Sequence, residues 1–291
     1  MHAVDNVAAV QCEAGESPRW DSDAHLLYWA DIVNPHLYCF DPASGDLKTF
    51  DCEVPVTGIG LRQSGGLVLA SKTGLYLLDS EFRHFRFIAD PEAAKPNVRF
   101  NDGMVDRCGR YWAGTLNETD LNAPDGSLYR LDPDCTLHTM DTGLQWPNGI
   151  GWSPDDRVMY LADSGAQAVY AYDFDYESGT PHNRRVFAEI PKGDGVPDGL
   201  TVDCEGGVWL GHWGGWHLKR YYPDGMLDQV VQIPVQNVTS CMFGGQKFDE
   251  LYVTTAWYLL DSQQRSDQPC SGDLFRVKQA IRGLPEPKFM G

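Results

Sequence analysis

Six polar residues occupy the same place in six copies of a repeated sequence pattern. They are Glu16, Thr57, Asn101, Asn148, Asp198 and Thr239, each four residues before the start of the turn that leads from the first to the second expected strand of its copy. Copies arranged around one axis would bring these side chains together at one mouth of a central channel. Two carboxylates and two carboxamides then form an all-oxygen ligand set, which suits Ca²⁺, Mg²⁺ or Mn²⁺ and tolerates Zn²⁺. The sequence therefore predicts one divalent cation at the axis.

A cation in this place would supply Lewis acidity, either polarising an ester carbonyl or lowering the pKa of a water molecule. Without it, the two acids would repel each other and one would take up a proton. A structural explanation competes with this one, because Asn-Asp-Gly and Pro-Asp-Gly sequences are common in turns. The turn explanation suffices for any single position, but the shared register of all six positions favours a site.

The elements that must position these side chains are short strands. The pattern V-D-x-x-G-x-x-W-x-G occurs at residues 105–114 and again at 202–211, and weaker copies bring the number to six, spaced 40 to 49 residues apart. Each copy continues with alternating apolar and polar residues and a turn, which is typical of antiparallel strands. Four short strands repeated six times predict an all-β fold, a six-bladed β-propeller that forms one domain over residues 1–291.

The expected blades are residues 13–52, 53–96, 97–144, 145–194, 195–236 and 237–291. A propeller must close into a ring, and residues 7–12 look like a spare strand ahead of the first blade. We expect this strand to complete the last blade.

Composition narrows the class of partner. The chain has 291 residues and a formal net charge of −18 spread along its length, which disfavours nucleic acid and anionic membranes as partners. The N-terminus lacks the pattern of a signal peptide, and the eight cysteines form no Cys-x-x-Cys motif. They indicate free thiols in a reducing compartment, so we expect a cytoplasmic protein that is a monomer or a weak homo-oligomer.

Four motifs follow one another along the chain: Gly15-Glu16-Ser17-Pro18-Arg19-Trp20, Arg99-Phe100-Asn101-Asp102-Gly103, Asn148-Gly149-Ile150-Gly151-Trp152 and Pro197-Asp198-Gly199-Leu200. Taken in this order, they resemble those of the SMP-30/gluconolactonase/luciferin-regenerating-enzyme (regucalcin-like) family. The resemblance covers about residues 11–290 and is to the aldonolactonases of the family. It implies a six-bladed propeller with a divalent metal on its axis.

The resemblance also implies roles for individual residues. It makes Glu16, Asn148 and Asp198 metal ligands, with Asp198 also the catalytic proton acceptor and donor, and it assigns Arg99 and Asn101 to substrate binding. Asp198 could take the proton of a water molecule and return it to the leaving alkoxide, and Arg99 could stabilise the developing oxyanion. The expected activity is hydrolysis of the carboxylic ester of a sugar lactone, giving the aldonic acid.

One position departs from the family pattern. The family has a further acidic substrate contact in the loop after the central strand of the third blade. Strict register places Thr119 there, with Glu118 one residue early. Glu118 is the candidate for this contact, and the identity of the sugar, a pentono- or a hexonolactone, stays open.

Other signals and other functions remain to be tested. Residues 212–217 read His-Trp-Gly-Gly-Trp-His; the histidines could bind zinc and the aromatic rings could stack on a sugar, or the segment could be a plain glycine-rich rim loop. Trp146 and Trp257 have the same status. A phosphotriesterase-like hydrolase and a non-catalytic calcium-binding propeller are the alternative functions on this scaffold.

Overall fold

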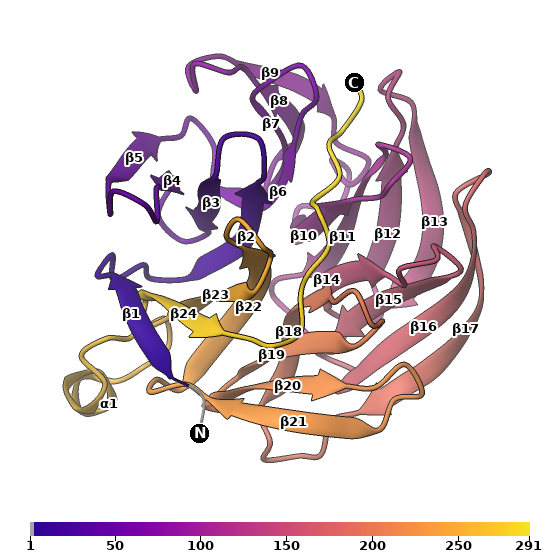
Figure 1. Ribbon diagram of the computed structural model, residues 1–291. Coiled ribbons are helices and arrows are strands. Elements are labelled where there is room, and N and C mark those ends of the chain that lie inside the picture. The colour runs from indigo at the N-terminus through magenta and orange to yellow at the C-terminus, as the bar shows by residue number, and fades with distance from the viewer. Residues whose placement is uncertain (1–2) are drawn as a thin grey trace.

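Six antiparallel sheets surround a central axis in the computed structural model of the protein, which describes residues 3–291 (Figure 1). Each sheet has four strands, and the first strand of each lies nearest the axis. The sheets are arranged as the blades of a propeller, which confirms the predicted all-β, six-bladed fold.

Five blades are built from consecutive strands, which lie within the ranges expected from the sequence. The first has β2 (Gly15–Asp21), β3 (Leu26–Asp31), β4 (His36–Phe40) and β5 (Leu47–Asp51). The second has β6 (Val56–Leu61), β7 (Leu67–Ser71), β8 (Gly74–Leu78) and β9 (Phe85–Ala89). The third has β10 (Val98–Val105), β11 (Tyr111–Asn117), β12 (Gly126–Leu131) and β13 (Leu137–Leu144). The fourth has β14 (Pro147–Trp152), β15 (Val158–Asp163), β16 (Ala168–Asp175) and β17 (Thr180–Glu189). The fifth has β18 (Val196–Val202), β19 (Val208–Trp213), β20 (His217–Tyr221) and β21 (Leu227–Gln232).

The sixth blade joins the two ends of the chain. It has β22 (Asn237–Gly244), β23 (Glu250–Ala256), β24 (Leu274–Lys278) and β1 (Val4–Ala8), with α1 (Ser262–Asp267) between β23 and β24. The N-terminal strand closes the ring as predicted, but its predicted bounds, 7–12, are wrong. The chain turns after Ala8, where the Val10 amide donates to the Ala8 carbonyl and Gln11 takes a φ of 52°. The strand therefore ends where the apolar run 7–10 suggested that it continues.

The repeated V-D-x-x-G-x-x-W pattern encodes a hairpin. In the third blade, the Asp106 carboxylate accepts hydrogen bonds from the amides of Cys108 and Arg110 across the turn. It also accepts one from the Trp112 indole at 2.8 Å. Asp203 makes the equivalent contacts in the fifth blade, including a 2.8 Å bond from its tryptophan. The aspartate thus shapes the turn and orients the large indole ring, which is fully buried.

These oriented rings form the contacts between blades. Trp112 packs edge-on against Trp152 and Phe174 of the next blade, with ring centroids 5.8 Å apart in both pairs. Trp209 packs in the same way on Phe243, also at 5.8 Å. Such contacts bury large apolar areas and add edge-to-face attraction, so the repeat holds the inner strands at fixed positions around the axis.

All six inner strands break their pairing near the start. The register shifts lie between Glu16 and Arg19, Val56 and Gly58, Phe100 and Gly103, Pro147 and Ile150, Pro197 and Leu200, and Val238 and Ser240. Bulges of this kind re-aim side chains and are common beside active sites. They coincide with the six polar positions found in the sequence.

Glycine follows three of these polar positions, at Gly58, Gly149 and Gly199, because the blades approach closely, and for Asn-Gly and Asp-Gly the turn explanation is wrong. Gly149 lies inside β14 and Gly199 lies inside β18. A Cβ added at Gly149 would come within 2.2 Å of the Leu200 amide nitrogen in the neighbouring inner strand. The Asn-Gly and Asp-Gly sequences therefore report packing at the axis.

The C-terminal segment, residues 279–291, crosses one face of the ring (Figure 1). The Phe289 amide donates to the Leu61 carbonyl, and the Met290 amide donates to the Gly109 carbonyl. The Phe289 side chain is fully buried. The channel is thus covered on this face, which leaves one face for a site. No helix within residues 3–291 has the length and apolar character needed to cross a bilayer.

Candidate active site

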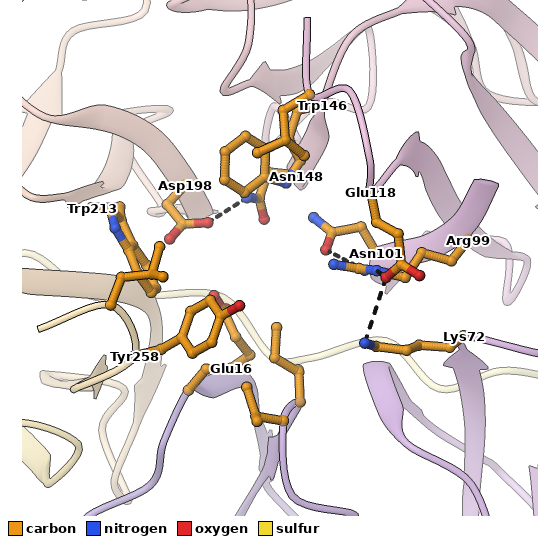
Figure 2. Close-up of a pocket in the computed structure, with 15 residues that line it drawn as sticks. Glu16, Lys72, Arg99, Asn101, Glu118, Trp146, Asn148, Asp198, Trp213 and Tyr258 are labelled. Carbon is orange, nitrogen blue, oxygen red and sulfur yellow. Dashed lines mark hydrogen bonds and ion pairs between the residues drawn. The ribbon is translucent and has the colours of Figure 1, made fainter. Parts of the chain in front are cut away.

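A cavity of about 250 Å³ lies at the face where the inner strands begin (Figure 2). Its polar lining includes all six residues that were expected to bind the metal or the substrate: Glu16, Arg99, Asn101, Glu118, Asn148 and Asp198. Thr57 and Thr239, the other two members of the repeated set, are buried but do not line it. The Thr239 hydroxyl instead donates to the Gly15 carbonyl. The predicted convergence therefore holds for the four positions with carboxyl or carboxamide groups.

The same local hydrogen bonds occur in two blades and position an acidic residue in one and an amide residue in the other. Asp31, at the end of β3, accepts from the amides of Glu13 and Ala14 just before Glu16. In the fourth blade, Asp163 does the same for residues 145 and 146, just before Asn148. Two equivalent aspartates therefore fix the backbone that enters each of these inner strands.

Glu16 and Asp198 are buried together at the base of the cavity. Burial raises the pKa of Glu16 well above its ordinary value, and the charges of Asp198 and Asp102 raise it further. Burial, followed by the Asp102 charge, also raises the pKa of Asp198 well above its ordinary value. This part of the channel therefore concentrates negative charge in a place with little water to screen it.

Asn148 contacts one of these two acids, Asp198, and lines the cavity beside it. Its side-chain nitrogen donates to Asp198 Oδ1 and to the Ser164 hydroxyl. Figure 2 shows the amide oxygen of Asn148 pointing into the cavity, away from that contact. The amide is thus oriented by a donor contact on one side and presents an oxygen on the other.

These groups fit a divalent cation. Within the described residues, the buried Oε2 of Glu16 has no hydrogen-bond partner, and a buried carboxylate oxygen without a partner is costly. Glu16, Asn148 and Asp198 offer oxygen donors from three separate blades, with two negative charges to balance a divalent ion. Three protein ligands would leave coordination positions for water or substrate.

The opposite side of the cavity is built around Arg99. Its Nε lies 2.9 Å from Glu118 Oε2, and its Nη1 donates to Asn101 Oδ1 at 3.2 Å. Asn101 in turn donates to the Pro147 carbonyl at 3.0 Å. Glu118 thus faces the cavity, whereas the amide and hydroxyl of Thr119 both donate to Asn117. Of these two loop residues, Glu118 is therefore the one whose side chain lines the cavity.

Lys72 lines the cavity and was missed by the sequence reasoning. It lies in the tight turn between β7 and β8, and its Nζ is 3.5 Å from Glu118 Oε2. The signal was present, because the Ser71-Lys72-Thr73-Gly74 hairpin must lie at the same rim as the loop that carries Glu118. Figure 2 shows Lys72 and Arg99 on either side of that carboxylate.

Apolar and aromatic residues complete the wall. Trp146 and Trp213 line the cavity, as expected for rim aromatics, together with Tyr258 and the exposed Leu259. Trp257 does not line it. Its indole nitrogen donates to the Gln11 carbonyl, and the Arg265 guanidinium stacks on its ring at 3.8 Å. The neighbouring Tyr258 takes the place that the sequence suggested for Trp257.

Comparison with known proteins identifies the class. Residues 14–257 match the family model described as SMP-30/Gluconolactonase/LRE-like region, so the chain belongs to this family.

Individual relatives cover nearly the whole chain. The chain is 35% identical to regucalcin from Oryctolagus cuniculus over 294 aligned positions, which cover 99% of this chain and 98% of that protein. It is 34% identical to a 6-deoxy-6-sulfogluconolactonase from Pseudomonas putida over 279 positions, covering 95% of each chain. A solved structure of a calcium-binding protein, regucalcin from Agrobacterium tumefaciens, superimposes with a TM-score of 0.94 at 25% identity, covering 99% of this chain and 97% of that one.

Proposed function

We propose that this protein hydrolyses a sugar lactone to its aldonic acid, using one divalent cation held by Glu16, Asn148 and Asp198. The observation that carries the proposal is the pair of buried acids at the base of a polar cavity, where one carboxylate oxygen is unpartnered. The relative from Pseudomonas putida, named as a sulfogluconolactonase, supports the reaction class.

The bound cation would supply Lewis acidity toward the lactone carbonyl and the attacking water. Asp198 provides the proton transfer. One of its oxygens is fixed by Asn148, so the carboxylate has a defined orientation toward the cavity. It accepts a proton from water as the ring ester is attacked and returns it to the alkoxide that leaves.

The other residues bind the sugar. Arg99 and Asn101 are held to each other and present donors to the carbonyl and hydroxyl oxygens of the substrate, where Arg99 stabilises negative charge that develops during attack. Glu118 accepts hydrogen bonds from hydroxyl groups. Trp146 and Trp213 offer apolar faces for the C–H side of the ring.

Lys72 indicates a preference within this substrate class. Lys72 and Arg99 both contact the single carboxylate of Glu118, so this rim carries more positive than negative charge. A lactone with an anionic substituent at the end distant from the ester suits such a rim.

The test is a substrate panel. Pentonolactones, hexonolactones and a sulfonated hexonolactone are assayed for acid release with the metal-free protein and after addition of Ca²⁺, Mg²⁺, Mn²⁺ or Zn²⁺, alongside an aryl phosphotriester. Metal-dependent release of aldonic acid is expected. Hydrolysis of the phosphotriester alone would replace the proposal with the phosphotriesterase function.

A calcium-binding role without turnover is the second candidate, because the relative from Agrobacterium tumefaciens is described as a calcium-binding protein. Tight Ca²⁺ binding without hydrolysis of any lactone or phosphotriester in the panel would favour it. The free state of all eight cysteines is compatible with the reducing, cytoplasmic setting that we propose for the protein.

A further inference from the structure

A second group of metal-binding side chains lies in the fifth blade, outside the axial set. His212 and His217 are direct partners across the antiparallel pair β19 and β20, so both project from the same face of the sheet. Their ring centroids are 4.7 Å apart. Asp194 lies in the connection between β17 and β18 and packs on this face. One ligand atom from each of the three residues lies within 4.8 Å of the others.

The hydrogen bonding at His212 leaves a lone pair without a partner. Its Nδ1 lies 2.9 Å from the Asp194 carbonyl, and a carbonyl can only accept, so Nδ1 carries the hydrogen. Nε2 of the neutral ring then carries a lone pair. That atom is fully buried and has no hydrogen-bond partner among the described residues. A buried acceptor needs a partner, and a metal ion is one that an imidazole lone pair can take.

His217 presents a second such nitrogen. Its Nε2 is buried, also without a hydrogen-bond partner in residues 3–291, and lies 3.4 Å from Asp194 Oδ1. Two ligands of one tetrahedral zinc ion are about 3.3 Å apart, given zinc bond lengths of ~2.0–2.1 Å. The separation between His217 and Asp194 therefore already matches a pair of ligands on one ion.

Burial favours the neutral form of both rings, which is the form that binds a metal. Burial lowers the pKa of His212 to about 4. Burial, followed by the charge of Lys219, lowers the pKa of His217 below its ordinary value. Neutral imidazoles offer their lone pairs without competition from protons.

We propose that Asp194, His212 and His217 bind a transition-metal ion of the zinc type, separate from the axial cation. Two imidazoles and one carboxylate form a donor set suited to Zn²⁺ and unlike the all-oxygen set at the axis. The Asp194 carbonyl, which accepts from His212 Nδ1, plays the part of the group that usually orients a metal-binding histidine from behind.

Lys219 opposes this binding and gives the proposal a distinctive test. Its ammonium group pairs with Asp194 Oδ2, which leaves Oδ1 on the side of His217. The ammonium repels a cation placed between the histidines, so it weakens the site without being part of it. Removing the charge of Lys219 should strengthen metal binding, whereas removing either histidine should abolish it.

The site has a structural consequence for the cavity. Trp213, which lines the cavity, directly follows His212, and Asp198 lies four residues after Asp194. A metal at Asp194, His212 and His217 would join the 192–195 loop to the β19–β20 hairpin. It would thereby hold two segments of the rim in place and stabilise the folded protein in proportion to its occupancy.

The experiment counts zinc ions on the metal-free protein. Zn²⁺ is titrated by calorimetry, and bound metal is measured by elemental analysis, both with the axial site silenced by Glu16→Gln/Asp198→Asn and with that site presaturated by Ca²⁺ in the unchanged chain. We expect one Zn²⁺ per chain in both settings, loss of that ion in His212→Gln and in His217→Gln, and a rise in melting temperature on zinc addition only where both histidines remain.

Lys219→Met supplies the opposite change. We expect its zinc affinity to increase by about tenfold or more, the effect of removing a like charge from a buried site. The absence of bound zinc in the silenced protein would overturn the proposal. So would a zinc ion that persists when either histidine is replaced in the protein whose axial site is silenced. Since these readouts concern zinc alone, they do not depend on whether the axial site hydrolyses lactones.

Discussion

The two ends of the central channel both contain buried carboxyl groups, but they balance the charge differently. At the open end, Glu16 and Asp198 face the cavity. Toward the sealed end, Asp102 and Glu286 lie on either side of Arg19, with nitrogen–oxygen separations of 3.6 and 3.5 Å. The sealed end therefore carries its own cation within the chain.

Arg19 shows what a structural solution to buried charge looks like. Besides its two acidic neighbours, its guanidinium donates to the carbonyls of Pro18, Ile59 and Gly103. The open end has acids of the same kind, and Glu16 Oε2, like Glu286 Oε1, has no hydrogen-bond partner within residues 3–291. The difference is the cation: among these residues no Lys, Arg or His side chain forms an ion pair with Glu16 or Asp198, whereas Arg19 pairs with both acids at the sealed end. Acids compensated from inside the chain hold the fold together, whereas acids left uncompensated at a cavity are available to a ligand. The following changes test this distinction.

The largest expected effect is at Asp198. Asp198→Asn keeps an oxygen donor but removes the titratable group and one charge. We expect turnover of the lactone to fall by about 10²–10⁴-fold, the usual contribution of a positioned general base, while the variant folds and binds its cation more weakly. Steady-state kinetics and metal titration measure the two effects.

Glu286→Gln is the matched control, because it makes the same acid-to-amide change at the sealed end. It should leave metal binding unchanged and turnover within a few-fold of the parent. An Asp198→Asn variant that hydrolyses lactone nearly as fast as the parent would make Asp198 a ligand only, with Glu16 the next candidate for the base.

Removing Arg19 should damage the fold. Arg19→Met leaves Asp102 and Glu286 buried without their cation, and breaking a buried ion pair in this way costs about 3–5 kcal/mol. Urea unfolding of the metal-loaded protein measures the loss. A loss below about 1 kcal/mol would show that the sealed end does not rely on internal compensation.

The sealed end should also have a distinct pH dependence. Burial raises the pKa of Glu286 from 4.5 to about 7, despite the opposing charge of Arg19. Between these two values the folded protein binds more protons at this group than the unfolded chain does. Its contribution to the free energy of unfolding therefore falls as pH rises from about 4.5 to 7, by about 1–3 kcal/mol in all.

The comparison of the parent protein with Glu286→Gln isolates this contribution. Urea unfolding from pH 4.5 to 8 should show the stability of the parent declining relative to the variant across that window. Parallel pH curves for the two proteins would contradict the assignment.

The smallest expected effect is at Lys72. Lys72→Met removes one positive charge from the rim without touching the acids at the base. We expect KM for a sulfonated lactone to rise several-fold, kcat to stay the same, and KM for an uncharged lactone to change little. Equal changes for both substrates would indicate that Lys72 has a general structural role.

Much of this architecture could be predicted from the sequence because contacts between residues close in the chain determine it. The aspartates that shape each hairpin, such as Asp106, act on residues two to six positions away, so the pattern survives as a repeat. The repeat then places Glu16, Asn148 and Asp198 at equivalent positions, and the cavity contains all three.

The remaining features depend on contacts between distant segments. The C-terminal segment has no periodic pattern, and it is held on the ring by Phe289, by backbone hydrogen bonds and by the ion pairs of Glu286 and Lys288 with distant residues. Lys72 and Tyr258 reach the cavity from turns whose lengths differ between blades, so strict register could not place them. The C-terminal end of β1 depends on the turn near Gln11, and the apolar composition of residues 7–10 gives no sign of that turn.

The most direct test of the axial assignment links metal content to turnover in the unchanged chain. The protein is freed of metal with a chelator, and lactone hydrolysis is then measured as Ca²⁺ or Mg²⁺, which prefer oxygen ligands over imidazole, is added back, with bound metal determined at each step in Glu16→Gln as well as in the parent. We predict that metal-free protein is inactive, that activity returns in proportion to one ion bound per chain, and that Glu16→Gln needs a higher ion concentration to recover. Full activity in protein shown to contain no metal would contradict the account.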